Sequence, residues 1–236
     1  MRRRELIRAA GAAALGGIFP AAVAAKAGLA MPSKSCKATP RSARGPFFTT
    51  SPLRSDIREG REGVPLKLSV RVLNDWSCEP IAGVPVEIWQ CDAAGVYSNV
   101  ENIDFDYKSL KPGGAGPDTR GQMFLRGHQL TDERGAVEFT TIFPGWYTGR
   151  VPHLHLHAVA GGAEWTAHDT QLFFDPAIER AVYATAAYAA RGQSPMSVER
   201  DLVLHGDRKA LKALTLALDR DGDGYRGRFA LAMQSL

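Results

Sequence analysis

The chain has 236 residues, of which 44% are hydrophobic and 23% charged, and its formal net charge at pH 7 is +4. Four arginines and one glutamate in the first 24 residues account for most of that charge, so the remainder carries about +1. With this near-neutral balance, the chain lacks the excess positive charge that drives binding to nucleic acid. Beyond residue 24 no apolar run is long enough to span a bilayer, and the roughly 212 remaining residues suffice for one substantial core.

Residues 1–24 have the pattern of an export signal. A basic start is followed by an apolar stretch rich in Ala and Gly and by a small-x-small site at Ala22-Val23-Ala24. The pair Arg3-Arg4 favours a twin-arginine signal over a plain secretory one. An uncleaved anchor helix is the alternative, but the apolar run contains a proline and is short for a membrane span. We therefore expect an exported protein, periplasmic or secreted.

Residues 25–64 are rich in Ser, Pro, Arg and Gly and show no sustained period, which predicts an irregular arm laid over a domain at 65–236. The chain has three cysteines, Cys36, Cys78 and Cys91, and an exported protein can join two of them. A strand over 84–91 would place Cys91 about 23 Å from its first residue. The arm's Cys36 is therefore the easier partner for Cys78.

From residue 65 onward, apolar and polar residues alternate, as they do in half-buried strands. The alternating segments are 66–73, 84–89, 135–143, 153–160 and 170–175. Near the end, "LTLALD" and "YRGRFALAM" flank "RDGDG", a pattern typical of a hairpin. The stretch 98–121 is rich in Gly and Pro, and we expect it to be a long loop that shapes a site.

One helix is predicted over 176–190, with Asp175 as its N-cap and Pro176 at its first position. Many short strands with Gly-rich turns, and almost no alternation of strand and helix, indicate an all-β fold. We expect an antiparallel β-sandwich with long irregular loops and one or two short helices.

The segment "HLHLH" places His153, His155 and His157 on one face of a predicted strand, and the two leucines on the other. Imidazoles two residues apart on one face can bind a single metal ion. A solvated polar face is the simpler alternative. Six residues before His153 lies Tyr147, whose phenol has an ordinary pKa near 10 and is not a ligand by default.

A second segment, "VEIWQCDAAGVYSNVE" at 86–101, places Tyr97 in a turn directly after a strand. Together with "GPFF" (45–48), "RSDIREG" (54–60) and "LTDERGAVEFTTIFPGWYTGRVPHLH" (130–155), it makes the chain resemble the intradiol ring-cleavage dioxygenases. This family comprises catechol 1,2-, hydroxyquinol 1,2- and protocatechuate 3,4-dioxygenases. The resemblance covers nearly the whole chain after residue 24 and is strongest toward exported, single-chain members.

The resemblance implies a mononuclear non-haem Fe(III) held by two tyrosinates and two histidines. Carried over position by position, these ligands fall on Tyr97, Tyr147, His153 and His155. Arg150 matches a family arginine that faces the substrate, and Gln171 matches a glutamine beside it, so both join Tyr147 as candidate catalytic residues.

Two further residues need a separate interpretation. His157 has no counterpart in the family pattern, and we expect it to support the site or lie at the surface rather than bind metal. Tyr107 is a rival tyrosine, but it lacks the Gly-x-Tyr turn after a strand, and we expect it in a loop near the pocket.

The implied activity is cleavage of a catechol-type ring with O2 between the two hydroxylated carbons, giving a cis,cis-muconate-type diacid. The implied partners are a small aromatic diol and O2, without nucleic acid or a membrane span in the mature chain, and a homo-oligomer is possible. Two alternatives remain open: a non-catalytic β-sandwich that binds metal or a ligand, and an oxidase with a metal held by His153, His155 and His157.

Overall fold

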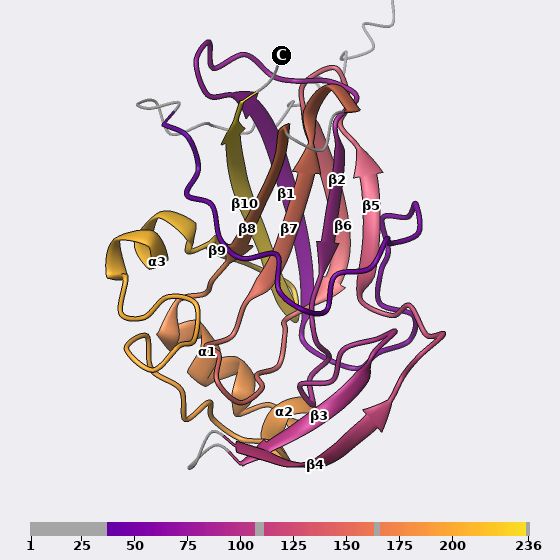
Figure 1. The fold of residues 1–236 in the computed structure, drawn as a ribbon, viewed down its shortest axis with the longest axis vertical. Coiled ribbons are helices and arrows are strands. Elements are labelled where there is room, and N and C mark those ends of the chain that lie inside the picture. The colour runs from indigo at the N-terminus through magenta and orange to yellow at the C-terminus, as the bar shows by residue number, and fades with distance from the viewer. Residues whose placement is uncertain (1–36, 107–110, 163–165, 235–236) are drawn as a thin grey trace, which may run out of the picture. The chain divides into compact units, whose positions relative to one another are not determined.

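The computed structural model describes residues 37–106, 111–162 and 166–234 (Figure 1). Two four-stranded sheets, in the orders β6-β1-β10-β9 and β5-β2-β7-β8, form its framework. The strands of the first sheet are β1 (Pro65–Asn74), β6 (Ala136–Ile142), β9 (Ala217–Asp221) and β10 (Gly224–Met233). Those of the second are β2 (Pro85–Trp89), β5 (Arg126–Leu130), β7 (Leu154–Val159) and β8 (Ala167–Leu172).

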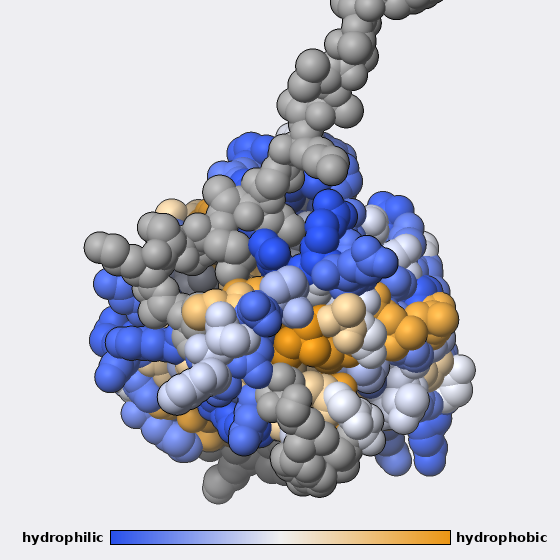
Figure 2. All heavy atoms as spheres, turned by 90° about the horizontal axis from the view of Figure 1, so that it is seen from above, coloured by the Kyte–Doolittle hydropathy of each residue, from blue (hydrophilic) through white to orange (hydrophobic). Residues whose placement is uncertain are grey.

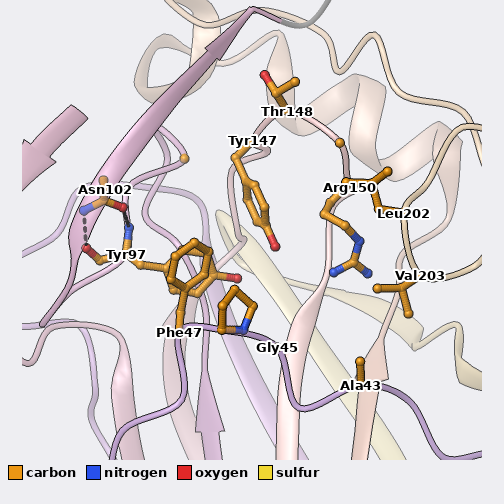
Figure 3. Close-up of a pocket in the computed structure, with 13 residues that line it drawn as sticks. Ala43, Gly45, Phe47, Tyr97, Asn102, Tyr147, Thr148, Arg150, Leu202 and Val203 are labelled. Atoms are coloured by element: carbon orange, nitrogen blue, oxygen red, sulfur yellow. Dashed lines mark hydrogen bonds between the residues drawn. The ribbon is translucent and has the colours of Figure 1, made fainter. Parts of the chain in front are cut away.

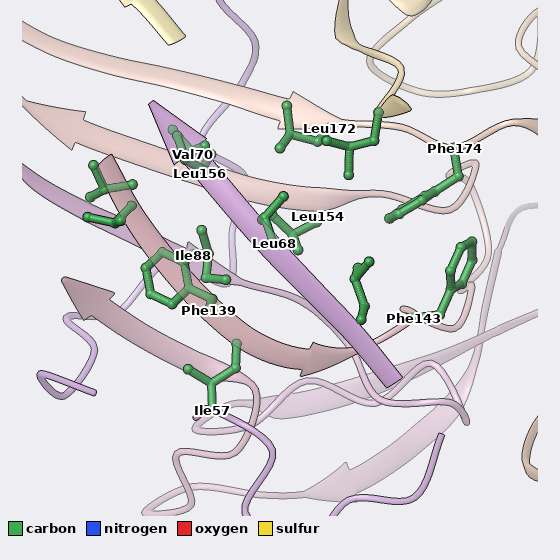
Figure 4. Packing of buried hydrophobic residues seen from close by; sticks show 14 of the residues in the cluster. Ile57, Leu68, Val70, Ile88, Phe139, Phe143, Leu154, Leu156, Leu172 and Phe174 are labelled. Atoms are coloured by element: carbon green, nitrogen blue, oxygen red, sulfur yellow. The ribbon is translucent and has the colours of Figure 1, made fainter. Parts of the chain in front are cut away.

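The sheets pack face to face through one hydrophobic core (Figure 4). Alternate residues of β1, such as Leu68 and Val70, face Ile88 of β2 and the two leucines of β7, Leu154 and Leu156. Their side chains are at most 1% exposed. The period-two pattern of the sequence therefore corresponds to the inner faces of a β-sandwich, and the predicted fold class is confirmed.

One pairing departs from the antiparallel arrangement. β1 pairs with β6 in the antiparallel direction but with β10 in the parallel direction, over Leu66–Asn74 and Tyr225–Met233. The carboxyl-terminal strand is consequently inserted in the interior of its sheet, with β9 at the edge. The predicted "RDGDG" hairpin is the β9–β10 turn.

The helices differ from the prediction in number and length. The described residues contain α1 (Pro176–Tyr183), α2 (Ala186–Ala189) and α3 (Arg208–Leu214). Asp175 caps α1 by accepting from the backbone N–H of Ala177, as predicted. The single helix predicted over 176–190 is divided because Thr185 adopts extended backbone angles (φ −79°, ψ 158°). Helix α3 occupies Leu214, where the sequence suggested the start of a strand, and β9 begins only at Ala217.

Three further strands were missed by pattern reading. Strands β3 (Glu101–Asp106) and β4 (Lys111–Asp118) pair within the stretch expected to be a loop. β5 reads "RGHQL" and has no alternation, and it forms because its backbone pairs with β2.

None of the described helices has the length and apolar character required to cross a bilayer.

The segment 37–64 contains no helix and only isolated bridges to neighbouring strands. It runs alongside β8, where Ser42 N–H donates to the carbonyl oxygen of Asp169 at 2.9 Å, and crosses in front of β7 (Figure 1). Viewed from above in Figure 2, hydrophilic residues form most of the visible surface around a smaller group of hydrophobic ones.

Cys78 is disulfide-bonded, and Cys91 is buried and free. The partner proposed for Cys78 from the sequence, Cys36, lies outside the described residues, as does the segment 1–24 that was interpreted as an export signal.

Candidate functional site

The outer face of the sheet β5-β2-β7-β8 carries the candidate site. On β7, His155 and His157 point to the side opposite the buried leucines, as the sequence predicts. His155 lies directly across from Trp89 of β2 and Gln171 of β8. Its ring stacks on the indole of Trp89, with ring centres 4.7 Å apart and an interplanar angle of 5°.

His153 immediately precedes β7, and a backbone contact orients its ring. Its Nδ1 lies 2.7 Å from the carbonyl oxygen of Val151, so Nδ1 carries the proton and Nε2 keeps a free lone pair. That Nε2 is 3.1 Å from Nε2 of His155 and 3.2 Å from the hydroxyl oxygen of Tyr147. Burial, with further effects of Arg150, holds the pKa of both histidines well below the ordinary value, so both rings are neutral.

Tyr97 reaches the same place from the turn that follows β2. In that turn one carboxylate oxygen of Asp92 accepts from the N–H groups of Ala94 and Val96, both at 3.0 Å. Gly95 has φ +81°, and a Cβ there would lie 2.3 Å from the carbonyl oxygen of Trp146, so only glycine fits.

Two hydrogen bonds to its backbone and a stacked ring fix the position of Tyr97. Asn102 accepts from its backbone N–H at 3.0 Å and donates to its carbonyl oxygen at 2.9 Å (Figure 3). Phe47 stacks on its ring at 4.5 Å. Its hydroxyl is buried and has no hydrogen-bond partner among the described residues. Figure 3 shows this hydroxyl and that of Tyr147 directed toward one another.

Burial raises the pKa of both phenols. That of Tyr97 lies well above its ordinary value, because of burial and then of the neighbouring Tyr147. Burial also raises the pKa of Tyr147, to about 12, although nearby Arg150 opposes the shift.

These donors have the separations that a shared metal ion requires. Two ligand atoms at about 2.1 Å from one ion, at angles of roughly 90 to 110°, lie about 3.0 to 3.4 Å apart. The distances from His153 Nε2 to Tyr147 Oη and to His155 Nε2 fall in this range. The hydroxyl of Tyr97 has no partner among the described residues, and its ring centre lies 5.5 Å from that of Tyr147, which makes it the candidate for a fourth donor. Two phenol oxygens with two imidazole nitrogens form a donor set suited to a hard, highly charged cation such as Fe(III).

Arg150 and Gln171 lie beside the histidines. The guanidinium of Arg150 is 3.3 Å from Nε2 of His153 and also donates to the amide oxygen of Gln171. Gln171 is fully buried, and its amide nitrogen donates to the carbonyl oxygen of Ala43 at 2.7 Å. All six residues singled out in the sequence therefore come together.

Sequence reasoning missed Asp201, whose carboxylate accepts from Nε of Arg150 at 3.0 Å. Asp201 is 0% exposed and comes from the loop between α2 and α3. A lone aspartate in "SVERDLV" belongs to no motif, and we find no signal in the sequence that would have identified it.

His157 shares the face of His155 but pairs with a different residue. Its Nδ1 lies 2.9 Å from a carboxylate oxygen of Asp169, and Phe48 packs against its ring. Within the described ranges no three His, Cys, Asp or Glu side chains are arranged to hold one metal ion. The three-histidine oxidase considered from the sequence is therefore not supported by the geometry. Tyr107, the rival tyrosine, lies outside the described residues.

A cavity of about 440 Å³ opens beside the two tyrosines (Figure 3). The arm lines it through Ala43 and Phe47, and the loop after α2 lines it through Leu202 and Val203. Tyr147 and Arg150 line the cavity between them.

A family model described as "Dioxygenase" matches residues 42–193. The solved structure "Intradiol ring-cleavage Dioxygenase from Tetranychus urticae" is 31% identical with a TM-score of 0.71, over 85% of this chain and 96% of that one. The dioxygenase domain of a carbohydrate-binding fusion protein from Streptomyces sp. SirexAA-E is 26% identical with a TM-score of 0.56, over 85% of this chain and 100% of that one.

A 3-chlorocatechol 1,2-dioxygenase from Rhodococcus opacus 1CP shares the fold at 22% identity and a TM-score of 0.54, over 85% of this chain and 74% of that one. Among curated protein sequences, none matches the chain.

Proposed function

The chain belongs to the intradiol ring-cleavage dioxygenase family, and from this premise we propose that it is a non-haem Fe(III) enzyme. It would cleave a catechol-type ring with O2 between the two hydroxylated carbons and release a cis,cis-muconate-type diacid. One observation carries the proposal: Nε2 of His153 lies 3.2 Å from Oη of Tyr147 and 3.1 Å from Nε2 of His155. The buried hydroxyl of Tyr97, which has no partner among the described residues, lies beside them.

Tyr97, Tyr147, His153 and His155 would hold the iron, and two phenolates would offset much of its charge. When bound, Fe(III) supplies a Lewis acid that polarises the diol and activates its ring toward O2. The hydrogen bond from His153 Nδ1 to the backbone keeps the other nitrogen of that ring free to bind metal.

The remaining groups act on the substrate. Both tyrosines line the cavity and Tyr147 is the less buried of the two, so its oxygen, as a phenolate, would be the one placed to accept a proton from an entering diol. Arg150 is held by Gln171 and Asp201 beside His153, where its fixed positive charge would stabilise negative charge that develops on the ring.

Metal analysis and turnover test this proposal. Untagged protein is expected to bind iron stoichiometrically and to show the red-brown absorption of phenolate-to-iron charge transfer, and catechol under labelled O2 should give a diacid that carries both labelled atoms. Tyr147→Phe should shift or bleach the band because one phenolate is lost, whereas Tyr225→Phe, in the sandwich core, should leave it unchanged. Colourless protein that holds zinc or copper and consumes no O2 with any diol would instead indicate the non-catalytic binding protein.

We also propose that the protein is exported to the periplasm or secreted. The basic, apolar and small-residue order of residues 1–24 supports export. The disulfide at Cys78 adds support, because disulfides persist mainly in oxidising compartments.

A further inference from the structure

Arg150 is the residue of the cavity wall whose charge a substrate would meet, and its charge is already balanced. Its side chain is 7% exposed and pairs with Asp201, which is 0% exposed. One oxygen of Asp201 accepts from Nε of Arg150 at 3.0 Å and from the backbone N–H of Val151 at 2.7 Å. The guanidinium therefore has a buried counter-ion and is not a free cation.

The second oxygen of Asp201 holds the part of the cavity wall that the loop between α2 and α3 forms. It accepts from the backbone N–H groups of Val203 at 2.9 Å and Leu204 at 2.8 Å. These contacts fix the loop whose Leu202 and Val203 line the cavity (Figure 3). One buried carboxylate thus both pairs with Arg150, so that the pair carries no net charge at a distance, and holds an apolar surface against the substrate space.

The rest of the wall offers no compensating charge. Among the described residues that line the cavity, Arg150 alone is ionic, and its neighbours include Ala43, Phe47, Leu202 and Val203. A ring carboxylate would therefore be desolvated against apolar groups with no unpaired cation beside it, which is unfavourable. The volume of about 440 Å³ lies within the usual range of ligand sites and leaves room for an apolar ring substituent.

We propose that this site selects neutral catechols, including those with apolar ring substituents, over ring-carboxylated ones, and that Asp201 is the positioning residue that sets this selectivity. This inference rests on the proposed function, since it concerns the diol that the same site would cleave.

The test compares 4-methylcatechol with 3,4-dihydroxybenzoate on iron-loaded mature protein. Both kcat/KM and anaerobic binding by calorimetry are measured. We expect kcat/KM to favour the neutral diol by roughly 10- to 100-fold, which is a common size for discrimination by a pocket wall. Equal or better turnover and binding of the carboxylated diol would overturn the inference.

Three variants test whether the lack of an unpaired cation in the cavity wall causes the selectivity. Leu202 is 56% exposed at the cavity, so Leu202→Arg adds a cation without disturbing the core, and it should raise relative efficiency on the carboxylated diol by about 10-fold. Leu202→Gln controls for polarity. Leu53→Arg makes the same change at a leucine that is 64% exposed and outside the wall, and should leave the ratio unchanged. A ratio that Leu202→Arg does not move would contradict the proposed cause.

Asp201→Asn removes the counter-ion. It should shift the same ratio toward the carboxylated diol because Arg150 is freed, whereas a purely structural loss would lower efficiency on both diols alike.

The measurements on the native protein separate this inference from the proposed function. If the native protein turns over no diol but still binds the neutral one more tightly, the proposed function fails while the selectivity stands. Turnover of both diols at equal efficiency would overturn only the selectivity.

Discussion

Gly45 shows how a single position on the arm controls a histidine on β7. Its φ is +81°, and a Cβ placed on it would lie 2.9 Å from Cε1 of His155. The ring of His155 is therefore held between Trp89 on one side and the bare backbone of the arm on the other. Because the ring has no freedom to tilt, its Nε2 stays directed at His153.

Gly45→Ala is expected to lower iron content and shift the charge-transfer band, because the added methyl group must displace the ring of His155. The positive φ alone should cost about 1 to 2 kcal/mol of stability. Gly60→Ala is the matched control, since Gly60 has φ +74° and a Cβ added there would meet nothing within 4 Å. Thermal unfolding should show the backbone cost for Gly60→Ala and a loss at least as large for Gly45→Ala, and metal analysis should separate the two variants. Equal iron content in the two proteins would contradict the role of Gly45.

The arm that crosses β8 and β7 covers a sheet face that would otherwise be solvated. Arg41 donates to the carbonyl oxygen of Ala167 at 2.6 Å, and Thr170 donates to that of Pro40 at 2.9 Å. A side-chain contact completes the attachment, since Arg44 lies 2.8 Å from Asp169 of β8. These contacts bury the histidines and place one wall of the cavity.

The pH dependence of this attachment follows from Asp169. Burial by itself raises the pKa of Asp169, but hydrogen bonds from His157 and Arg44 outweigh it and lower the pKa to about 2. Since the folded-state value lies below the ordinary value of 3.8, the carboxylate stabilises the fold above about pH 4. That contribution is lost as the pH falls toward 2.

Asp169→Asn should therefore reduce the free energy of unfolding by about 2 kcal/mol near pH 6. The difference from the native protein should shrink as the pH falls below about 4, because the native carboxyl then becomes neutral as well. Urea denaturation across this range measures both effects. Glu199→Gln, which breaks an exposed pair with Arg208, should change stability far less, because solvent screens that pair. A loss for Asp169→Asn that does not vary with pH would contradict this origin.

At the scale of the whole molecule, the fold is closed by contacts between distant parts of the chain. β1 and β10 pair in parallel along nine residues of each strand. The sandwich core is thus complete only when the carboxyl-terminal strand is in place. The proposed iron site would need the folded sandwich, which would agree with export in the folded state, the route that a twin-arginine signal would use.

The proposed export is tested on the full chain in a bacterial host that has a twin-arginine pathway. The native chain should be recovered outside the cytoplasm, shortened by the signal. Changing both Arg3→Lys and Arg4→Lys should leave uncleaved protein in the cytoplasm, whereas Arg2→Lys, outside the pair, should be exported normally. Mass spectrometry of each cell fraction measures the outcome. Full-length native chain confined to the cytoplasm would contradict export.

The sequence by itself determined which residues share a face of a strand. Alternation in "LKLSVRVL" places Leu68 on the apolar face of its strand, and alternation in "HLHLH" separates Leu154 from the histidines. Both follow because side chains alternate at every residue of a strand, whatever lies opposite. The motifs around Tyr97 and Tyr147 likewise indicated the family, since their order and spacing are local properties of the chain.

Only the tertiary structure decided what lies across from each of those faces. The arm buries the histidine side of β7, so a strand that reads as half-buried is buried on both faces. Asp201 reaches Arg150 from 51 residues away, and β5 forms although its own sequence does not alternate. Such partners meet through long-range packing and backbone pairing, and the periodicity of one segment holds no information about which distant segment will cover it.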